Sequence, residues 1–201
     1  MVRVALTGGI ATGKSYVLAR FADHDVPTVD ADVVARDVVR PGRPAWTALR
    51  RRFGPDMFAE DGALDRKRLA SHAFDDPVAR ADLEAIVHPH VRSAIDDWFR
   101  AVSTNSEATF AIADIPLLFE TNRAGNFDRI IVTACDRATQ LARLMTRDTL
   151  SEEEGLKRLA AQLPTTVKTA GADFVICTDG SFDDTTRQVD DVFRALHDGE
   201  K

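Results

Sequence analysis

Short apolar runs alternate along the chain with segments in which apolar residues recur every three or four positions. Runs rich in Val, Ile, Ala and Phe have the length and composition of buried strands, whereas the 3.6-residue period is typical of amphipathic helices. Strands that alternate with helices predict a parallel sheet covered by helices on both faces. The predicted strands lie at residues 2–7, 26–30, 108–116, 127–135 and 172–178.

The segment between the second and third predicted strands differs from the rest. From residue 45 to residue 102 the pattern is almost entirely helical, so we interpret this block as an insertion into the α/β domain. Asp65 is expected to cap one of its helices, because an aspartate before a helix accepts hydrogen bonds from the free N–H groups. Pro77 opens a longer helix, and Pro89 inside it is expected to kink or interrupt that helix, because proline lacks an N–H.

Helices are also expected in the other gaps between strands and at the end of the chain. One begins near Gly13, and another runs from Ala31 to about Arg40. Two more, at residues 137–148 and 151–163, form a helical hairpin, and the sequence S-E-E-E at Ser151–Glu154 is typical of a capping box that starts a helix. The last predicted helix covers residues 181–198.

Composition and charge narrow the class of protein. With 201 residues the chain is long enough for one α/β domain with inserted helices, and its formal charge of −6 argues against a general nucleic-acid binder. The basic run Arg50–Arg52 is a local exception, which is either a solvated helix face or a ligand patch. No apolar run approaches the ~18 residues of a membrane span, so we expect a cytoplasmic protein without a membrane partner. Cys135 and Cys177 have no metal-type spacing and are interpreted as small core residues.

The strongest chemical signal is the stretch LTGGIATGKSY near the start of the chain. Gly8, Gly13, Lys14 and Ser15 satisfy the pattern G-x-x-x-x-G-K-[ST] of a phosphate-binding loop. An apolar strand precedes the loop and a helix follows it, a context that favours this reading over an ordinary glycine-rich turn. Lys14 would then reach the β- and γ-phosphates of a nucleotide, and Ser15 would be a ligand of Mg²⁺.

Carboxylates at the ends of predicted strands supply further candidates. Asp30 and Asp32 follow the second strand, and they would face the phosphate cleft if that strand lay beside the first. One of them could then accept a proton from a substrate hydroxyl. The alternative is that an aspartate here, Asp32 included, merely caps the following helix. Asp114, after the third strand, is a candidate for holding a metal-bound water.

Three arginines lie on the predicted helical hairpin, at positions 143, 147 and 158. Such a hairpin could close over transferring phosphates as a lid, or it could be a charged and solvated surface element, and the spacing does not separate the two. His88 beside Pro89 is similarly open, because a lone histidine can serve either structure or catalysis.

The order of the motifs resembles the dephospho-CoA kinase family over nearly the whole chain, from Val4 to about Ser181. The motifs that carry the resemblance are LTGGI-x-x-GKS, VDADVVAR, RPGRPA, DG-LDR-x-x-LA, IVHP, PLLFE, QLARLMTRD, LSEEE, AAQLP and ADFVI. The resemblance implies a P-loop NTPase fold of the nucleoside-monophosphate-kinase type. It also implies ATP and Mg²⁺, with transfer of the γ-phosphoryl group to the ribose 3′-hydroxyl of dephospho-CoA, the last step of coenzyme A biosynthesis.

The resemblance assigns domains and site residues by position. It implies a nucleotide-binding core (1–40, 103–137 and 165–201), a helical CoA-binding domain (41–102) and a lid (138–164). The residues that match the family's active site are Thr7, Lys14, Asp32 and Arg143. On the nucleotide side it implies Ala11, Thr12, Gly13, Lys14, Ser15, Tyr16, Arg147 and Gly180. On the acceptor side it implies Asp32, Arg66, His88, Leu117 and Glu120.

Three positions depart from the usual pattern of the family that the chain resembles. Ala11 and Tyr16 replace a glycine and a threonine in the loop, so Ala11 is expected to adopt a backbone conformation that alanine tolerates. Thr178 stands where the family favours asparagine, which puts adenine contacts through that loop in doubt. The alternatives are a kinase for another small molecule and a GTPase switch, although the guanine-reading element [NT]-K-x-D does not occur. We expect a monomer that binds no nucleic acid.

Overall fold

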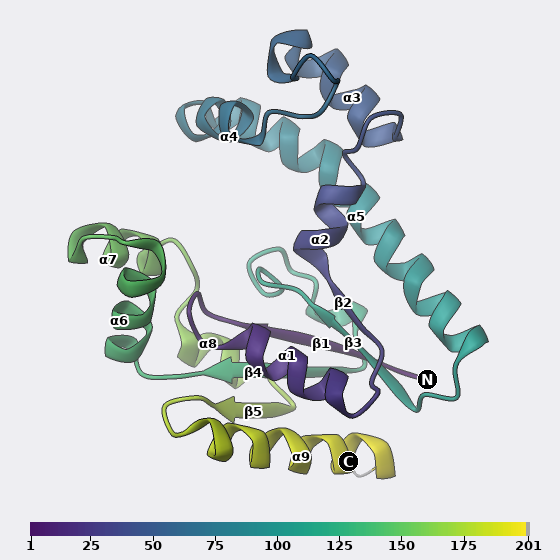
Figure 1. Cartoon of the computed structure of the whole chain (residues 1–201), viewed down its shortest axis with the longest axis vertical. Helices are drawn as coiled ribbons and strands as arrows, with labels where there is room; N and C mark the ends of the chain where they lie inside the picture. The colour runs from purple at the N-terminus through teal and green to yellow at the C-terminus, as the bar shows by residue number, and fades with distance from the viewer. Residues whose placement is uncertain (200–201) are drawn as a thin grey trace. The chain divides into compact units, whose positions relative to one another are not determined.

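The computed structural model describes residues 1–199 (Figure 1). By their contacts these residues divide into two compact units, which are described one at a time. The first unit takes in Met1–Val29 and the chain from Val102 onward, and the second is Asp30–Ala101. None of the helices within 1–199 has an apolar stretch long enough to cross a lipid bilayer.

The strands of the described residues form one five-stranded sheet in the order β2-β3-β1-β4-β5. The pairs β1–β3, β1–β4 and β4–β5 are parallel, and they place β1 at the centre, with Leu6 opposite Asp114 on one side and Ile131 on the other. This sheet and its helices confirm the predicted fold class. The strands are β1 (Val2–Gly8), β2 (Thr28–Asp30), β3 (Phe110–Asp114), β4 (Arg129–Ala134) and β5 (Phe174–Cys177).

Asp30 and Asp32 were expected to face the phosphate cleft on the condition that the second strand, β2, lies beside the first, β1. β2 lies beside β3, and β3 rather than β2 lies beside β1. The order of strands in space is set by which buried faces pair, not by the order of the chain, and the fully buried β3 takes the position next to the central strand. The condition that the second strand lies beside the first is therefore not met.

Helices cover both faces of the sheet in the first unit. On one face α1 (Lys14–Asp23) and α9 (Phe182–Asp198) pack against the strands, and on the other the short α8 (Thr165–Ala170) packs against β4 (Figure 1). The predicted helices at α1 and α9 are confirmed, but α8 was not predicted, because its six residues TTVKTA carry no helical period. The core between α1, α9 and the sheet contains Val4, Leu6, Val17, Phe21, Phe110, Ile112, Ile131, Ile176, Val189 and Val192.

The predicted hairpin is present as α6 (Arg137–Asp148) and α7 (Glu152–Ala160). The capping box is confirmed, since the Ser151 hydroxyl accepts from Glu154 N and the Glu154 carboxylate accepts from Ser151 N. The Glu154 carboxylate accepts hydrogen bonds from Ser151 N and from the Ser151 hydroxyl, and these bonds, the one from the main chain first, hold the pKa of Glu154 below its ordinary value. The short turn between α6 and α7 is therefore fixed by its own sequence.

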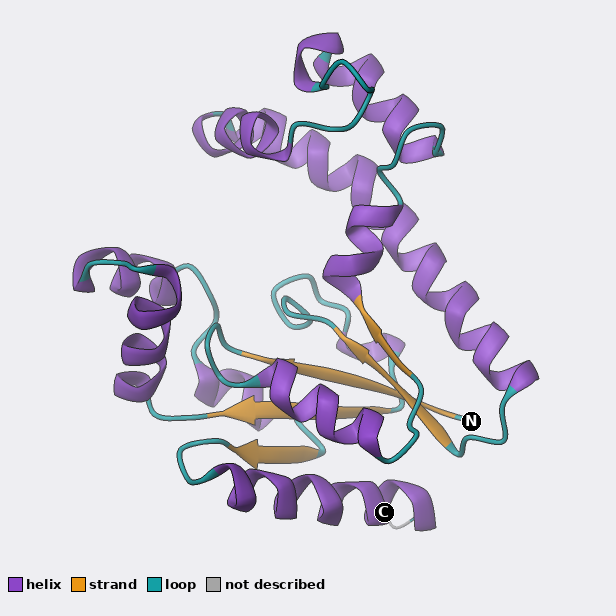
Figure 2. Ribbon diagram, viewed as in Figure 1, coloured by secondary structure: helices purple, strands orange, loops and turns teal. Residues whose placement is uncertain are grey.

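The second unit is helical, as predicted (Figure 2). Val39, Ala45 and Leu49 form its buried centre. Asp65 caps α4, because its Oδ1 accepts from Arg68 N at 3.0 Å, and this prediction is confirmed. The elements of this unit are α2 (Ala31–Asp37), α3 (Pro44–Phe53), the 3₁₀ turn η1 (Pro55–Met57), α4 (Arg66–Asp75) and α5 (Pro77–Asn105). The last residues of α5 belong to the first unit, which also contains the 3₁₀ turn η2 (Ala124–Asn126).

Two smaller expectations are corrected. Of the two outcomes expected at Pro89, a kink or an interruption, the interruption is wrong, because α5 runs on through Pro89 to Asn105, with Val91 and Ile95 buried on its apolar side. Of the two cysteines, Cys135 is buried but Cys177 is exposed. Cys177 lies on the edge strand β5, whose alternate residues face away from α9, so its interpretation as a core residue is wrong.

Candidate active site

The phosphate-binding loop joins β1 to α1 and is tied to itself and to β4. Thr12 is almost fully buried, and its hydroxyl donates to Gly9 O at 2.8 Å. The same hydroxyl lies 2.7 Å from Thr133 Oγ1 on β4. α1 begins at Lys14 directly after the left-handed Gly13, and no side chain caps it. The first N–H groups of α1 and its positive end are therefore available to an anion, as a phosphate site requires.

Ala11 departs from the expectation for this loop. Its φ is 61°, in the left-handed region, rather than in a conformation that alanine tolerates easily. Such a conformation costs an alanine roughly 1–2 kcal/mol and persists only where surrounding contacts hold it. The loop thus keeps the shape that a glycine would adopt there without strain, and the expectation is wrong.

A cavity of about 450 Å³ opens beside the loop. Two aromatic rings form part of its wall, because Tyr16 and Phe182 lie with their centroids 4.8 Å apart. The Tyr16 hydroxyl is fixed by Thr186 Oγ1 at 2.8 Å. Flat aromatic walls beside a phosphate loop offer a stacking surface for a purine. The residues that line the cavity are Gly13, Tyr16, Arg143, Thr178, Gly180, Ser181, Phe182 and Thr185.

Thr178 links three parts of this site. Arg143, on α6, donates from Nη1 to Thr178 Oγ1 at 3.0 Å and from Nη2 to Thr178 O at 2.6 Å. The Thr178 hydroxyl in turn donates to Thr12 O in the phosphate loop at 3.1 Å. Thr178 therefore joins the hairpin helix, the end of β5 and the loop.

Two other predicted residues of the first unit are engaged in ion pairs. Arg147 does not line the cavity, and its guanidinium bonds the neighbouring Asp148, with Nε at 2.8 Å from Oδ1. Arg158 Nη1 reaches the same carboxylate at 2.6 Å. Hydrogen bonding by Arg147, more than by Arg158, holds the pKa of Asp148 below its ordinary value. These contacts join α6 to α7.

Glu120 is likewise held within the protein. Its Oε1 lies 2.7 Å from Nζ of Lys168, a fully buried lysine of α8, and accepts from Leu163 N at 3.2 Å. Leu117, three residues after the buried Asp114 at the end of β3, is 43% exposed. Thr7 is fully buried in β1, and its hydroxyl donates to Pro116 O at 3.4 Å. Thr7 and Glu120 thus fasten the segment 116–120 at both ends.

Comparison with known proteins decides the family. The chain matches the family described as Dephospho-CoA kinase over residues 2–184. A dephospho-CoA kinase of Shouchella clausii is 42% identical over 190 residues, which cover 94% of this chain and 96% of that protein. The chain belongs to the dephospho-CoA kinase family. The resemblance found in the sequence is thereby confirmed, and the protein is an ATP-using kinase, a phosphotransferase.

Solved structures agree with this membership. A dephospho-CoA kinase from Campylobacter jejuni superposes with a TM-score of 0.76 at 25% identity, covering 99% of this chain and 98% of that one. A Thermus thermophilus protein, TT1252, superposes with a TM-score of 0.82 at 33% identity, and 97% of each chain is covered. The similarity therefore extends over the whole kinase rather than over the phosphate loop alone.

The remaining predicted residues lie in the second unit of this dephospho-CoA kinase family member. Asp32 is exposed in the first turn of α2, and Asp30 is the cap, because its Oδ1 accepts from Asp32 N at 2.7 Å and from Val33 N at 3.4 Å. The alternative that Asp32 is only a helix cap is therefore wrong. Arg66 is the first residue of α4, and His88 is exposed within α5.

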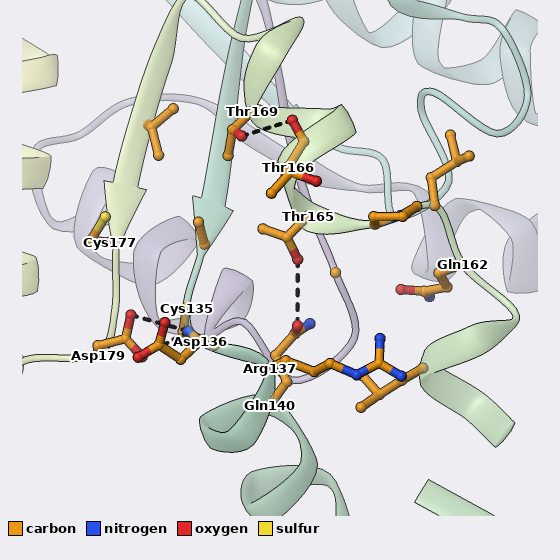
Figure 3. A pocket seen from close by; sticks show the side chains of 16 residues that line it. Cys135, Asp136, Arg137, Gln140, Gln162, Thr165, Thr166, Thr169, Cys177 and Asp179 are labelled. Atoms are coloured by element: carbon orange, nitrogen blue, oxygen red, sulfur yellow. Dashed lines mark hydrogen bonds between the residues drawn. The ribbon is translucent and has the colours of Figure 1, made fainter. Parts of the chain in front are cut away.

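Sequence reasoning missed a second cavity of the kinase, of about 540 Å³, next to the phosphate loop (Figure 3). Gln140, Gln162 and Thr165 come together there from α6, from the end of α7 and from the start of α8 (Figure 3). Both glutamines stand inside motifs of the family resemblance, QLARLMTRD and AAQLP, but those motifs do not say what the glutamine side chains contact. The other lining residues are Gly9, Ala134, Cys135, Asp136, Arg137, Leu159, Leu163, Pro164, Thr166, Thr169, Val175, Cys177 and Asp179.

Proposed function

We propose that this kinase transfers the γ-phosphoryl group of ATP to the ribose 3′-hydroxyl of dephospho-CoA, giving CoA and ADP. Membership in the dephospho-CoA kinase family supports the acceptor and the place in coenzyme A biosynthesis. The observation that supports ATP as the phosphoryl donor is the cavity of about 450 Å³ beside the phosphate loop, with Arg143 in its wall. Phosphoryl transfer is mostly positioning and electrostatics, and this arrangement supplies both.

On the nucleotide side, we assign Lys14 and the N–H groups at the start of α1 to the phosphates. The Tyr16–Phe182 wall suits the adenine, and Gly180 leaves room beside it. Arg143, held by Thr178 at the cavity wall, is placed to neutralise charge on the transferring group.

The residues at the loop also suit Mg²⁺. Ser15 is exposed in the first turn of α1, where no side chain caps the helix, so its hydroxyl oxygen is available as the hard ligand that Mg²⁺ prefers. Bound there, the ion would offset negative charge on the β- and γ-phosphate oxygens. Ser15 is the residue that we assign to hold it.

On the acceptor side, we assign Asp32 to receive the proton of the ribose hydroxyl. Its carboxylate is exposed and does not serve as the helix cap, so it is free for this role. Arg66, His88 and Leu117 are exposed and suit contacts to the bulky acceptor. Thr7 and Glu120 act as positioning residues for the segment 116–120.

These assignments agree with the predicted division of the chain into three parts. We propose that residues 41–102 bind dephospho-CoA, that residues 138–164 form a lid over the phosphates, and that the core is made of 1–40, 103–137 and 165–201. The lid assignment is supported by the position of Arg143 on α6. It is also supported by the ion pairs of Arg147 and Arg158 with Asp148, which hold α6 and α7 together. Action as a cytoplasmic monomer stays a prediction.

One acceptor panel tests the function. ADP release is measured with ATP and Mg²⁺ and with dephospho-CoA, adenosine, AMP or shikimate as acceptor, and the product is located by ³¹P NMR. We expect turnover with dephospho-CoA alone and a new phosphomonoester on the ribose 3′-oxygen. Faster turnover with adenosine, AMP or shikimate would establish instead a kinase of the same architecture for another small molecule.

A further inference from the structure

Both main-chain polar groups of Ile10, inside the phosphate loop, are bonded to glutamine side chains. Ile10 N donates to Gln162 Oε1 at 2.8 Å, and Gln140 Nε2 donates to Ile10 O at 2.9 Å. The two glutamines come from opposite ends of the helical hairpin. Gln140 lies in the first turn of α6, and Gln162 lies just beyond the end of α7. One residue of the loop is thus held from both ends of the hairpin.

The contact with Gln140 is built into the core rather than formed at the surface. Gln140 is only 6% exposed, and its Oε1 accepts from Thr165 Oγ1 at 3.4 Å, which fixes the orientation of its amide (Figure 3). The amide approaches the loop so closely that a Cβ at Gly9 would collide with Gln140 Nε2. Gly9 is therefore required for this approach rather than for a special backbone angle.

The Gln162 end is fixed independently. The next residue, Leu163, donates its N–H to Glu120 Oε1 at 3.2 Å, and Glu120 is held by the fully buried Lys168 at 2.7 Å. A hydrogen bond from Ile10 to a side chain on this fixed segment restricts the loop far more than one to a mobile surface side chain would.

The two bonds account for the strained residue that follows Ile10. With its N–H and its carbonyl both engaged, the peptide groups on either side of Ile10 cannot rotate freely. Ala11, at φ 61°, is therefore kept in a left-handed conformation that it would otherwise leave. The glutamines thus hold the phosphate loop in its working shape.

We infer that Gln140 and Gln162 are positioning residues that couple the shape of the phosphate loop to the helical hairpin. Arg143 stands three residues after Gln140 on α6, so the contact that shapes the loop also sets the helix that carries the arginine. The inference rests on the proposed function in one respect, which is that the bound nucleotide is ATP. It assigns to both glutamines a role that the sequence analysis did not give them.

The same substitution tests the two positions with opposite expectations. At position 162 the side chain accepts a hydrogen bond from Ile10 N, so Gln162→Glu keeps an acceptor and should retain activity within about threefold. At position 140 the side chain donates to Ile10 O, so Gln140→Glu places a carboxylate against a carbonyl and should lose activity. Gln162→Ala removes the acceptor and should lower kcat and raise the Kd for ATP, each on the order of tenfold.

The decisive readouts are ATP binding by calorimetry without acceptor, and amide hydrogen exchange of the free enzyme. In Gln162→Ala, exchange should speed up both in peptides spanning residues 9–16 and in peptides spanning 152–164, because one bond joins the two segments. Gln162→Glu should leave both segments as protected as in the wild type. ATP binding and exchange do not require the acceptor, so a wrong acceptor assignment would leave this test intact.

Two results would overturn the inference. One is Gln162→Ala with wild-type affinity for ATP and wild-type exchange in the loop. The other is Gln162→Glu as impaired as Gln162→Ala, which would show that the side chain matters for something other than accepting from Ile10. Because Gln140 is buried, the fold of Gln140→Glu is checked by its melting temperature, and the Gln162 pair decides the outcome if that variant is unstable.

Discussion

Arg143 and Thr178 are joined by two hydrogen bonds, one to the threonine hydroxyl at 3.0 Å and one to its main-chain oxygen at 2.6 Å. The guanidinium is thereby held at the wall of the 450 Å³ cavity, and the Thr178 hydroxyl in turn donates to Thr12 O. A small hydroxyl residue thus connects Arg143 to the phosphate loop.

The first prediction follows from this pair. Thr178→Val keeps the shape but removes the hydroxyl, which leaves Thr12 O without its partner and Arg143 with one bond. We expect the KM for ATP to rise roughly tenfold, the scale of one hydrogen bond to a charged group, with a smaller change in kcat. Thr178→Ser restores the hydroxyl and should restore the KM. Steady-state kinetics at saturating dephospho-CoA measures both variants, and an unchanged KM in Thr178→Val would refute the link.

The second prediction concerns Lys14. Lys14→Ala removes the positive charge that we assign to the β- and γ-phosphates, and turnover should fall on the order of 10²–10³. The matched control is Lys157→Ala, since Lys157 is exposed on α7 and its ammonium pairs with Glu153 at 2.7 Å. Coupled kinetics should show near wild-type turnover for the control. Near wild-type turnover in Lys14→Ala itself would remove the loop from the mechanism.

The third prediction separates chemistry from helix capping at Asp32. Asparagine cannot accept the proton of the ribose hydroxyl, so Asp32→Asn should lower kcat by roughly 10²–10⁴. The melting temperature and the affinity for ATP should change little, because Asp30 and not Asp32 caps α2. Asp37→Asn, at the other end of the same helix, is the control and should stay within twofold of wild type. A fully active Asp32→Asn enzyme would exclude the proposed proton acceptor.

The fourth prediction uses the strain at Ala11. Ala11→Gly removes the strain of a left-handed alanine, which is about 1–2 kcal/mol. It also gives the unfolded chain more conformational freedom, which lowers stability by about 0.4–1 kcal/mol. We expect a net gain of about 0.5–1 kcal/mol in the free energy of unfolding. The same change at Ala19, exposed within α1, should instead lose about 1 kcal/mol. Chemical denaturation measures both, and a loss of stability in Ala11→Gly would contradict the account of the loop.

The fifth prediction concerns the pH dependence of the two thiols. Burial disfavours the Cys135 thiolate and so raises the pKa of that thiol above its ordinary value, whereas Cys177 is exposed. At pH 7.5 iodoacetamide should label Cys177 first. Labelling of Cys135 should still be rising as pH passes the usual thiol pKa of about 8.5. Mass spectrometry of the intact protein and of Cys177→Ser follows the two sites, and equal rates at pH 7.5 would contradict the prediction.

The features that the sequence determined by itself are those fixed by neighbouring residues. Asp65 caps α4 and Ser151 with Glu154 starts α7, because each forms its bonds within three residues of the chain. The phosphate loop belongs to the same class, since its glycines, Lys14 and the following helix lie in one short stretch. The ordered motifs along the chain then identified the family, because their spacing reflects a shared fold.

The features that only the tertiary structure decided depend on residues far apart in the chain. The position of β3 between β1 and β2 follows from which buried faces pair, and no local pattern encodes that choice. The continuity of α5 through Pro89 likewise depends on packing rather than on local propensity.

The contacts around the phosphate loop show the same limit. Thr178 reaches Thr12, and Gln162 reaches Ile10, across more than 150 residues of sequence. The helical pattern around Gln140 does not show which way its side chain faces, yet the side chain is 6% exposed and bonded to the loop. Whether such a side chain faces solvent or a backbone carbonyl is settled only when the sheet and the hairpin have packed, because burial then obliges each polar group to find a partner.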